Sequence, residues 1–183
     1  MLSTVDVGAI RRVAELVARR NAIDAAIAQI IGRPVASGHL GEWLAAAIFD
    51  IALEESASAR GIDGRFRSGA LQGRTVNIKW YLAHQGLLDM NESAALDYYL
   101  VLAAPLSAAG SSRGISRPWC IDSVYLFDAR QLRAEQEVRG VKRGIASSVT
   151  KNQWGAARIY PSASHPLLPV TASQSALLTL FQS

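Results

Sequence analysis

The sequence has 183 residues, with 19 Lys and Arg against 15 Asp and Glu, half of its residues apolar and a single Cys. These proportions exclude a disordered chain and a small scaffold held by disulfides, and they predict one domain with a sizeable core. Cys120 has no partner within the chain, and the sequence shows neither a secretory signal nor a membrane-length apolar run, so we expect a soluble cytoplasmic protein with no membrane contact. Within residues 1–183 the predicted parts are N-terminal helices (1–58), a core of hairpin, strands and helix (59–138), and a basic loop, last strand and C-terminal helix (139–183).

Two helices are predicted first. Residues 5–31 carry apolar side chains at helical spacing, with several Arg residues scattered among them, and Gly32 and Pro34 end this helix. Residues 38–58 form the second helix, which is apolar on nearly every side through Ile51 and therefore typical of a buried helix.

Short β-like runs follow the two helices. The runs 62–66 and 75–81 flank a Gly-bearing stretch suited to a hairpin loop, and the alternation of apolar and polar residues in the second run indicates a half-buried strand. Residues 98–104 and 119–127 are mostly apolar and predict two central strands. The other predicted elements are a mobile loop at 106–118, a helix at 129–138 capped by Asp128, a last strand at 156–160 and a closing helix at 171–181.

Glu42 is the only acidic residue between positions 33 and 50, and it lies on the most apolar helix of the chain. A carboxylate buried there requires a partner. In the hairpin, a loop of about five residues would place Asp63 opposite Asn77 or Lys79, with all three on the polar face of the ribbon. A Glu from a helix and an Asp and a Lys from a hairpin would then converge.

Three short motifs carry a resemblance to a known family. They are Gly41-Glu42, Gly61-Ile62-Asp63-Gly64 and Val76-Asn77-Ile78-Lys79-Trp80. Together they resemble the active-site pattern of the PD-(D/E)xK nuclease superfamily, and they look closest to poorly characterised bacterial members. The resemblance covers roughly residues 36–138 and implies an α/β, restriction-endonuclease-like fold, with a mixed sheet flanked by helices and here preceded by an N-terminal helical pair.

The resemblance implies an endonuclease that hydrolyses phosphodiester bonds in DNA with Mg²⁺ or Mn²⁺. It makes Asp63 the central metal ligand, Glu42 the helix-borne auxiliary ligand and Lys79 the catalytic lysine. The chain departs from the pattern at Asn77, where the superfamily usually has Glu or Asp, so we expect Asn77 to be a weak or indirect ligand. Either Glu42 supplies the second carboxylate, or the domain is a catalytically inactive module that binds nucleic acid without cutting it.

Basic residues gather around the hairpin and in the stretch 139–158, which has no acid. We expect the following residues to contact nucleic acid: Arg65, Arg67, Arg74, Arg139, Lys142, Arg143, Lys151, Trp154 and Arg158. Trp154 is the one that would stack on a base. A homodimer would suit the cleavage of two strands.

Each of these residues also has an ordinary structural explanation. Glu42 would favour a helix N-terminus, Asp63 would suit a turn between two glycines, and Lys79 would suit a solvated strand. The stretch 139–158 would equally be a solvated loop. A protein that binds other proteins, and neither metal nor DNA, is the third interpretation.

Overall fold

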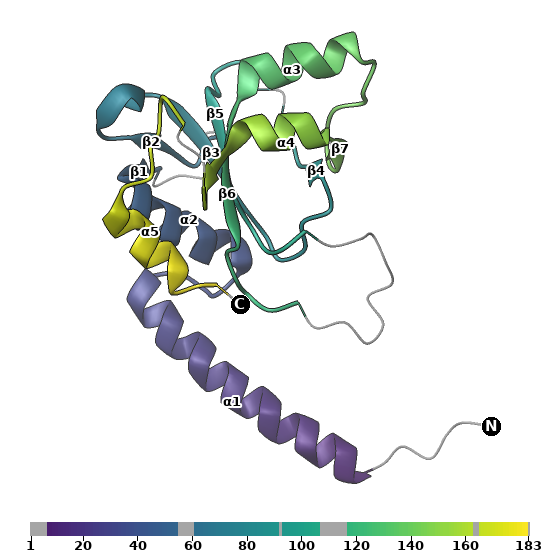
Figure 1. Ribbon diagram of the computed structural model, residues 1–183. Helices are drawn as coiled ribbons and strands as arrows, with labels where there is room; N and C mark the ends of the chain where they lie inside the picture. The colour runs from purple at the N-terminus through teal and green to yellow at the C-terminus, as the bar shows by residue number, and fades with distance from the viewer. Residues whose placement is uncertain (1–6, 55–60, 92, 107–116, 163–164, 183) are drawn as a thin grey trace, which may run out of the picture.

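The computed structural model describes residues 7–54, 61–91, 93–106, 117–162 and 165–182 (Figure 1). At its centre is a six-stranded sheet in the order β1-β2-β3-β5-β6-β8. Strands β3 and β5 are parallel, and every other neighbouring pair is antiparallel. The predicted mixed α/β class is therefore confirmed. The strand bounds are β1 (Ile51–Leu53), β2 (Gly64–Phe66), β3 (Thr75–Tyr81), β5 (Tyr98–Ala103), β6 (Ser123–Asp128) and β8 (Arg158–Tyr160).

Two helices precede the sheet, as predicted, but the second is shorter than expected. Helix α1 (Val7–Ile31) agrees with the predicted helix over its described part, whereas α2 (Ser37–Phe49) ends well before residue 58. Asp50 takes a left-handed conformation, with φ of 54°, and its N–H bonds to the carbonyl of Ala46. The chain then enters β1, where Ile51 is 2% exposed. The apolar run through Ile51 thus serves a helix and then an edge strand, and residues 55–58 lie outside the described part.

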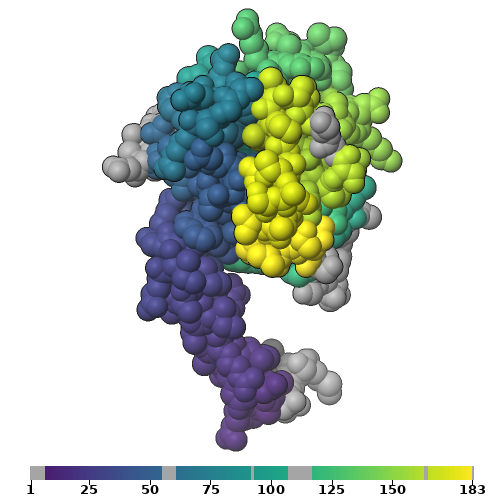
Figure 2. Space-filling view, turned by 60° about the vertical axis from the view of Figure 1, so that its left-hand side comes forward, coloured from purple at the N-terminus to yellow at the C-terminus, as the bar shows by residue number. Residues whose placement is uncertain are grey.

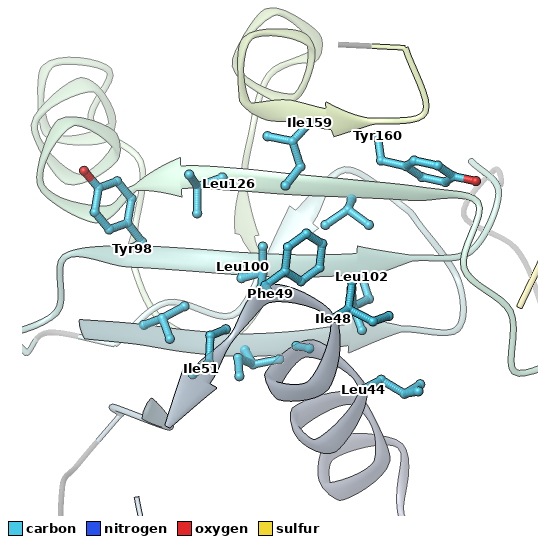
Figure 3. Packing of buried hydrophobic residues seen from close by; sticks show 14 of the residues in the cluster. Leu44, Ile48, Phe49, Ile51, Tyr98, Leu100, Leu102, Leu126, Ile159 and Tyr160 are labelled. Atoms are coloured by element: carbon cyan, nitrogen blue, oxygen red, sulfur yellow. The ribbon is translucent and has the colours of Figure 1, made fainter. Parts of the chain in front are cut away.

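One face of the sheet is covered by α2 and by α5 (Ala172–Thr179). Figure 3 shows this cluster, in which side chains of α2 meet those of the central strands; its labelled members include Leu44, Ile48, Phe49, Leu100, Leu102 and Leu126. Apolar residues at every second position of β3, β5 and β6 supply the sheet side of the cluster. This layer places α2, and Glu42 with it, against β3.

The other face is covered by α3 (Ala129–Val138), by α4 (Lys151–Ala157) and by a small sheet of β4 (Leu87–Leu88) and β7 (Ser147–Ser148). Because both faces are covered, β5 and most of β6 are buried along their length, as predicted for central strands. The prediction for β3 was wrong in one respect. Its first four residues are all buried, so its polar face is not solvated at Thr75 and Asn77 and is half-buried at Lys79.

Local sequence signals located most of the remaining elements. The hairpin of β2 and β3 is present, with a short 3₁₀ turn (Gly69–Leu71) in its loop. The carboxylate of Asp128 accepts the N–H of Gln131 at 2.8 Å and caps α3 as expected. Strand β6 begins later than predicted, at Ser123, and α5 follows the N-cap Thr171.

The prediction of a continuous loop over residues 139–158 is wrong. This stretch contains β7 and the helix α4, whose N-terminus is a capping box between Thr150 and Gln153. Because α4 takes the first two residues of the predicted last strand, β8 begins only at Arg158. Most of the predicted loop at 106–118 lies outside the described residues. None of the described helices is long and apolar enough to cross a membrane.

Candidate active site

The site forms where β3 extends past its neighbour β2. The two strands pair only at Gly64 with Val76 and at Arg65 with Thr75, whereas β3 continues to Tyr81 beside β5. Asp63 lies immediately before β2, and its carboxylate accepts the backbone N–H of Ile78 at 2.6 Å. Asp63 therefore bonds to the middle residue of Asn77-Ile78-Lys79.

Two glycines allow this close assembly. A Cβ at Gly41 of α2 would lie 2.9 Å from the Cβ of Trp80, so the absence of a side chain lets α2 approach β3. A Cβ at Gly64 would lie 2.5 Å from the carbonyl oxygen of Ala52 in β1. Gly41 precedes Glu42 in the sequence motifs, and Gly64 follows Asp63. Both glycines thus have a steric role, because each permits a close contact between two elements next to an acid of the site.

Glu42 has the partner that its apolar surroundings require. Its carboxylate lies 2.6 Å from the guanidinium of Arg33, which belongs to the connection between α1 and α2. The side chain of Glu42 is 20% exposed and that of Arg33 is 46% exposed. Arg33 was not among the predicted site residues, although it is the nearest Arg or Lys before Glu42, the acid that was expected to need a partner.

The charges around Asp63 act on one another. Burial raises the pKa of Asp63, and the negative charge of Glu42 raises it further. The N–H of Ile78, the ammonium of Lys79 and the guanidinium of Arg33 lower it, but the net direction is upward from the ordinary value. Glu42, Lys79 and Arg33 therefore all act on the charge of Asp63.

Asn77 is 3% exposed, and its side-chain Oδ1 has no hydrogen-bond partner among the described residues. Alternation along β3 puts Asn77 on the same face as Lys79, and the strand register places Asn77 beside Tyr99. A buried acceptor without a partner costs about 1–3 kcal/mol. Asn77 thus adds an unsatisfied oxygen on the strand that Asp63 contacts.

The donor set of this site suits a hard cation. The described residues contain no group of three or more His, Cys, Asp or Glu side chains placed to hold a metal. The carboxylates of Asp63 and Glu42 are the oxygen donors that act on one another, whereas alternation along β3 puts the amide of Asn77 on the face turned away from α2. Oxygen donors of this kind match Mg²⁺, which needs only one or two carboxylates together with waters and phosphate. A cation there would also offset the repulsion by Glu42 that adds to the effect of burial in raising the pKa of Asp63.

The arginines of the hairpin are exposed but each has an acidic neighbour. Arg65 lies 3.4 Å from Glu54, and its side chain is 53% exposed. The other two pairs are Arg67 with Asp50 at 3.8 Å and Arg74 with Asp97 at 3.2 Å. Exposed pairs of this kind are weak, so a phosphate would compete with the acids for these guanidinium groups.

The second basic group lies on the α3 and α4 side of the sheet, across from α2 (Figure 1). Arg139 donates to the side chain of Gln153 at 3.1 Å, and Arg143 lies 3.6 Å from Glu137. The exposed members of this group are Arg139, Lys142, Lys151 and Arg158, whereas Arg143 is half-buried.

Trp154 does not belong to this exposed group. It is 6% exposed, and its ring packs against those of Tyr125 and Phe127, with centroids 4.6 Å and 4.9 Å away. We therefore withdraw Trp154 as a residue that stacks on a base. Trp154 lies in the middle of α4 and belongs to the core. The sequence signal that could have predicted this helix is its capping box.

A cavity of about 460 Å³ lies between α3, α4 and residues 165–167. Its polar lining includes Asp128, Glu135 and His165, but it contains none of Glu42, Asp63, Asn77 and Lys79. The candidate active site is thus separate from this cavity.

No family model matches the chain, and no curated protein is similar enough to be matched.

Proposed function

We propose that this protein is a Mg²⁺-dependent nuclease that hydrolyses phosphodiester bonds in DNA, with a restriction-endonuclease-like arrangement of its core. The observation that carries the proposal is the contact of Asp63 with the centre of Asn77-Ile78-Lys79, together with the influence of Glu42 and Lys79 on the pKa of Asp63. The chain order also supports it. A helix bearing Glu42 precedes three antiparallel strands, and the third of these is parallel to the next long strand, β5.

In this proposal, Asp63 and Glu42 hold the metal. When bound, Mg²⁺ supplies a Lewis acid for the phosphate and a nucleophilic water at neutral pH. Lys79 donates a hydrogen bond to a non-bridging phosphate oxygen or to the attacking water and stabilises the negative charge that develops. Because Asn77 is neutral, we expect the metal to bind more weakly than it would to three carboxylates.

Arg33 has a second role in the proposed reaction. In the protein without metal, its guanidinium neutralises Glu42. A cation bound by Glu42 would compete with Arg33, and the half-exposed guanidinium would then be free to bind the substrate phosphate. Arg33 would thus connect metal binding to substrate binding.

The activity is tested with the full chain, supercoiled and linear DNA, RNA, and Mg²⁺ or Mn²⁺. We expect nicking or cleavage that is abolished by Asp63→Ala and by Lys79→Ala. The substitution Asp122→Asn, which changes an exposed acid outside the site, is the control and should leave activity unchanged. Intact nucleic acid under all of these conditions would remove the catalytic part of the proposal.

The neutral Asn77 and the ion pair of Glu42 with Arg33 favour a second candidate, a catalytically inactive module that binds nucleic acid. Calorimetric titration with Mg²⁺ and Mn²⁺ separates the two candidates. Binding by both the wild type and Asn77→Asp supports the enzyme. Binding only by Asn77→Asp, together with salt-sensitive DNA binding, supports the inactive module. If neither metal nor DNA binds, both candidates are wrong.

A further inference from the structure

Helix α1 extends away from the rest of the described protein (Figures 1 and 2), and most of its large apolar side chains are exposed. Of its 25 residues, the structure describes only Ile31 as buried. Seven of its large apolar residues are between 47% and 70% exposed, namely Val7, Ile10, Val13, Leu16, Val17, Ile23 and Ile30. Most helix stability in proteins comes from the packing of an apolar face. The face of α1 therefore needs a partner that the described residues do not supply.

Four of these residues, Val13, Leu16, Ile23 and Ile30, follow the repeat of a coiled coil. Starting at Val13, the positions advance by three and then four residues, which gives the series Val13, Leu16, Arg20, Ile23, Ile27 and Ile30. Only Arg20 interrupts this apolar series. The helix has no Trp, Tyr or Phe, and its acids Glu15 and Asp24 pair with Arg12 and Arg20. A helix that lies on a lipid surface typically has aromatic or Leu anchors and a strongly basic polar face, whereas two of the four Arg residues of α1 are paired with acids, so a second helix fits better than a membrane.

The charge of Arg20 selects the direction of the pairing. In a parallel pair of two copies, Arg20 would face the partner's Arg20 in the same layer. In an antiparallel pair that sets Val13 opposite the partner's Ile30, Arg20 instead faces the partner's Ile23 and lies beside the partner's Asp24. Within one chain Arg20 already lies 3.4 Å from Asp24, so both charges are in position to pair across the seam.

The same antiparallel register is self-complementary along its whole length. When Val13 meets the partner's Ile30, Leu16 meets the partner's Ile27, and the two chains exchange these contacts symmetrically. The seam of 18 residues spans about 27 Å, at 1.5 Å per residue. The globular parts of the two chains would lie at opposite ends of the helix pair, since each is attached to the C-terminal end of its α1.

We propose that α1 binds a second copy of this chain as an antiparallel two-helix coiled coil in this register. The pairing does not depend on nuclease activity. Because the seam is shorter than three heptads, we expect a weak dimer with a Kd of roughly micromolar order.

Sedimentation equilibrium of the full chain over a range of roughly 1–500 µM tests the dimer. We expect concentration-dependent dimerisation that is lost in Leu16→Glu and in Ile23→Glu. Ala25→Glu, on the opposite side of α1, is the matched control and should leave the dimer intact. An unchanged unfolding transition of the globular part will show that the variants are folded. A monomer over the whole range, or equal disruption by Ala25→Glu, would overturn the proposal.

Thiol cross-linking tests the register. The native Cys120 is only 3% exposed, so introduced cysteines are the ones that react. We expect a mixture of Val13→Cys and Ile30→Cys chains to form mixed dimers, and neither variant to cross-link efficiently alone. Efficient cross-linking of Val13→Cys chains with one another would indicate a parallel pair and contradict the proposal. Flotation of a monomeric chain with anionic vesicles would assign α1 to a lipid surface instead.

Discussion

Replacement of Gly41 by Ala tests whether the contact between α2 and β3 sets the geometry of the site. The new Cβ would lie 2.9 Å from the Cβ of Trp80, and ordinary contact begins at 3.4 Å, so the helix and the strand must separate by at least about 0.5 Å. Trp80 is held by a hydrogen bond of 3.0 Å to the carbonyl of Cys120, so we expect α2 to be the element that moves.

Overpacking of this kind costs about 1–3 kcal/mol, which for a chain of this length lowers the Tm by about 2–12 °C. Gly38→Ala is the matched control. It changes the same residue type on the same helix. The Cβ added at position 38 would meet no described atom within 4 Å, apart from its chain neighbours and the backbone of α2 itself. Ala at this position should therefore stabilise the helix by up to about 1 kcal/mol.

Thermal and denaturant unfolding followed by circular dichroism measure both effects. A displacement of Glu42 should also lower cleavage activity in Gly41→Ala at temperatures where the variant is fully folded, because small misplacements of catalytic groups are costly. If Gly41→Ala has a Tm equal to or above that of the wild type, as expected for Gly38→Ala, the inferred close contact does not constrain the fold.

The two remaining predictions concern buried and partly buried acids. Because the pKa of Asp63 is raised, its contribution to stability is present at low pH and is lost as the pH rises through that pKa. Asp63→Asn should therefore gain stability relative to the wild type with rising pH, and it should lose metal binding. The opposite trend in urea titrations at several pH values would contradict this prediction. Burial opposes ionisation of Asp97, but the N–H and hydroxyl of Thr75, at 2.8 Å and 3.0 Å, and the guanidinium of Arg74 outweigh it and lower the pKa of Asp97. The contribution of Asp97 to stability is thus lost as the pH falls through the lowered pKa. Asp97→Ala should lower the free energy of unfolding by about 1–3 kcal/mol near pH 7 and by less near pH 3. An equal loss at both pH values in denaturant unfolding would count against the carboxylate as the cause.

Elements with a local signal could be predicted from the sequence. Helix α3 begins where Asp128 caps it, and the hairpin loop lies where glycines allow a turn. The end of α2 had no such signal, because Asp50 is a non-glycine residue in a left-handed conformation. Strand β1 was not predicted, because its apolar residues continue the pattern of the helix before it. The apolar spacing of α1 predicted a helix correctly but did not show that the helix extends away from the core.

The site was predicted as a set of residues and only in part as a geometry. Glu42 and Lys79 both act on the pKa of Asp63, whereas the roles of the three residues as metal ligands and catalytic lysine stay predictions. The burial of Asn77 was not expected, because it depends on the second layer of helices that covers β3 from the other side. The partnership of Arg33 with Glu42 crosses the break between α1 and α2, and a periodicity argument made within one helix does not reach across such a break.

The contact between α5 and α2 has a consequence for the order in which the protein folds as it is synthesised. Gln174 donates its side-chain amide to the carbonyl of Ile48 at 2.8 Å, so residues 126 positions apart in the chain complete the same layer. Figure 2 shows α5 in yellow lying along the α2 region. Until α5 leaves the ribosome, the apolar surface of α2 and the sheet next to it has no cover. A nascent chain paused before residue 172 should thus expose the apolar surface of α2 and the sheet to chaperones. The residues of the α3 and α4 side are all synthesised earlier, so that side can already be packed.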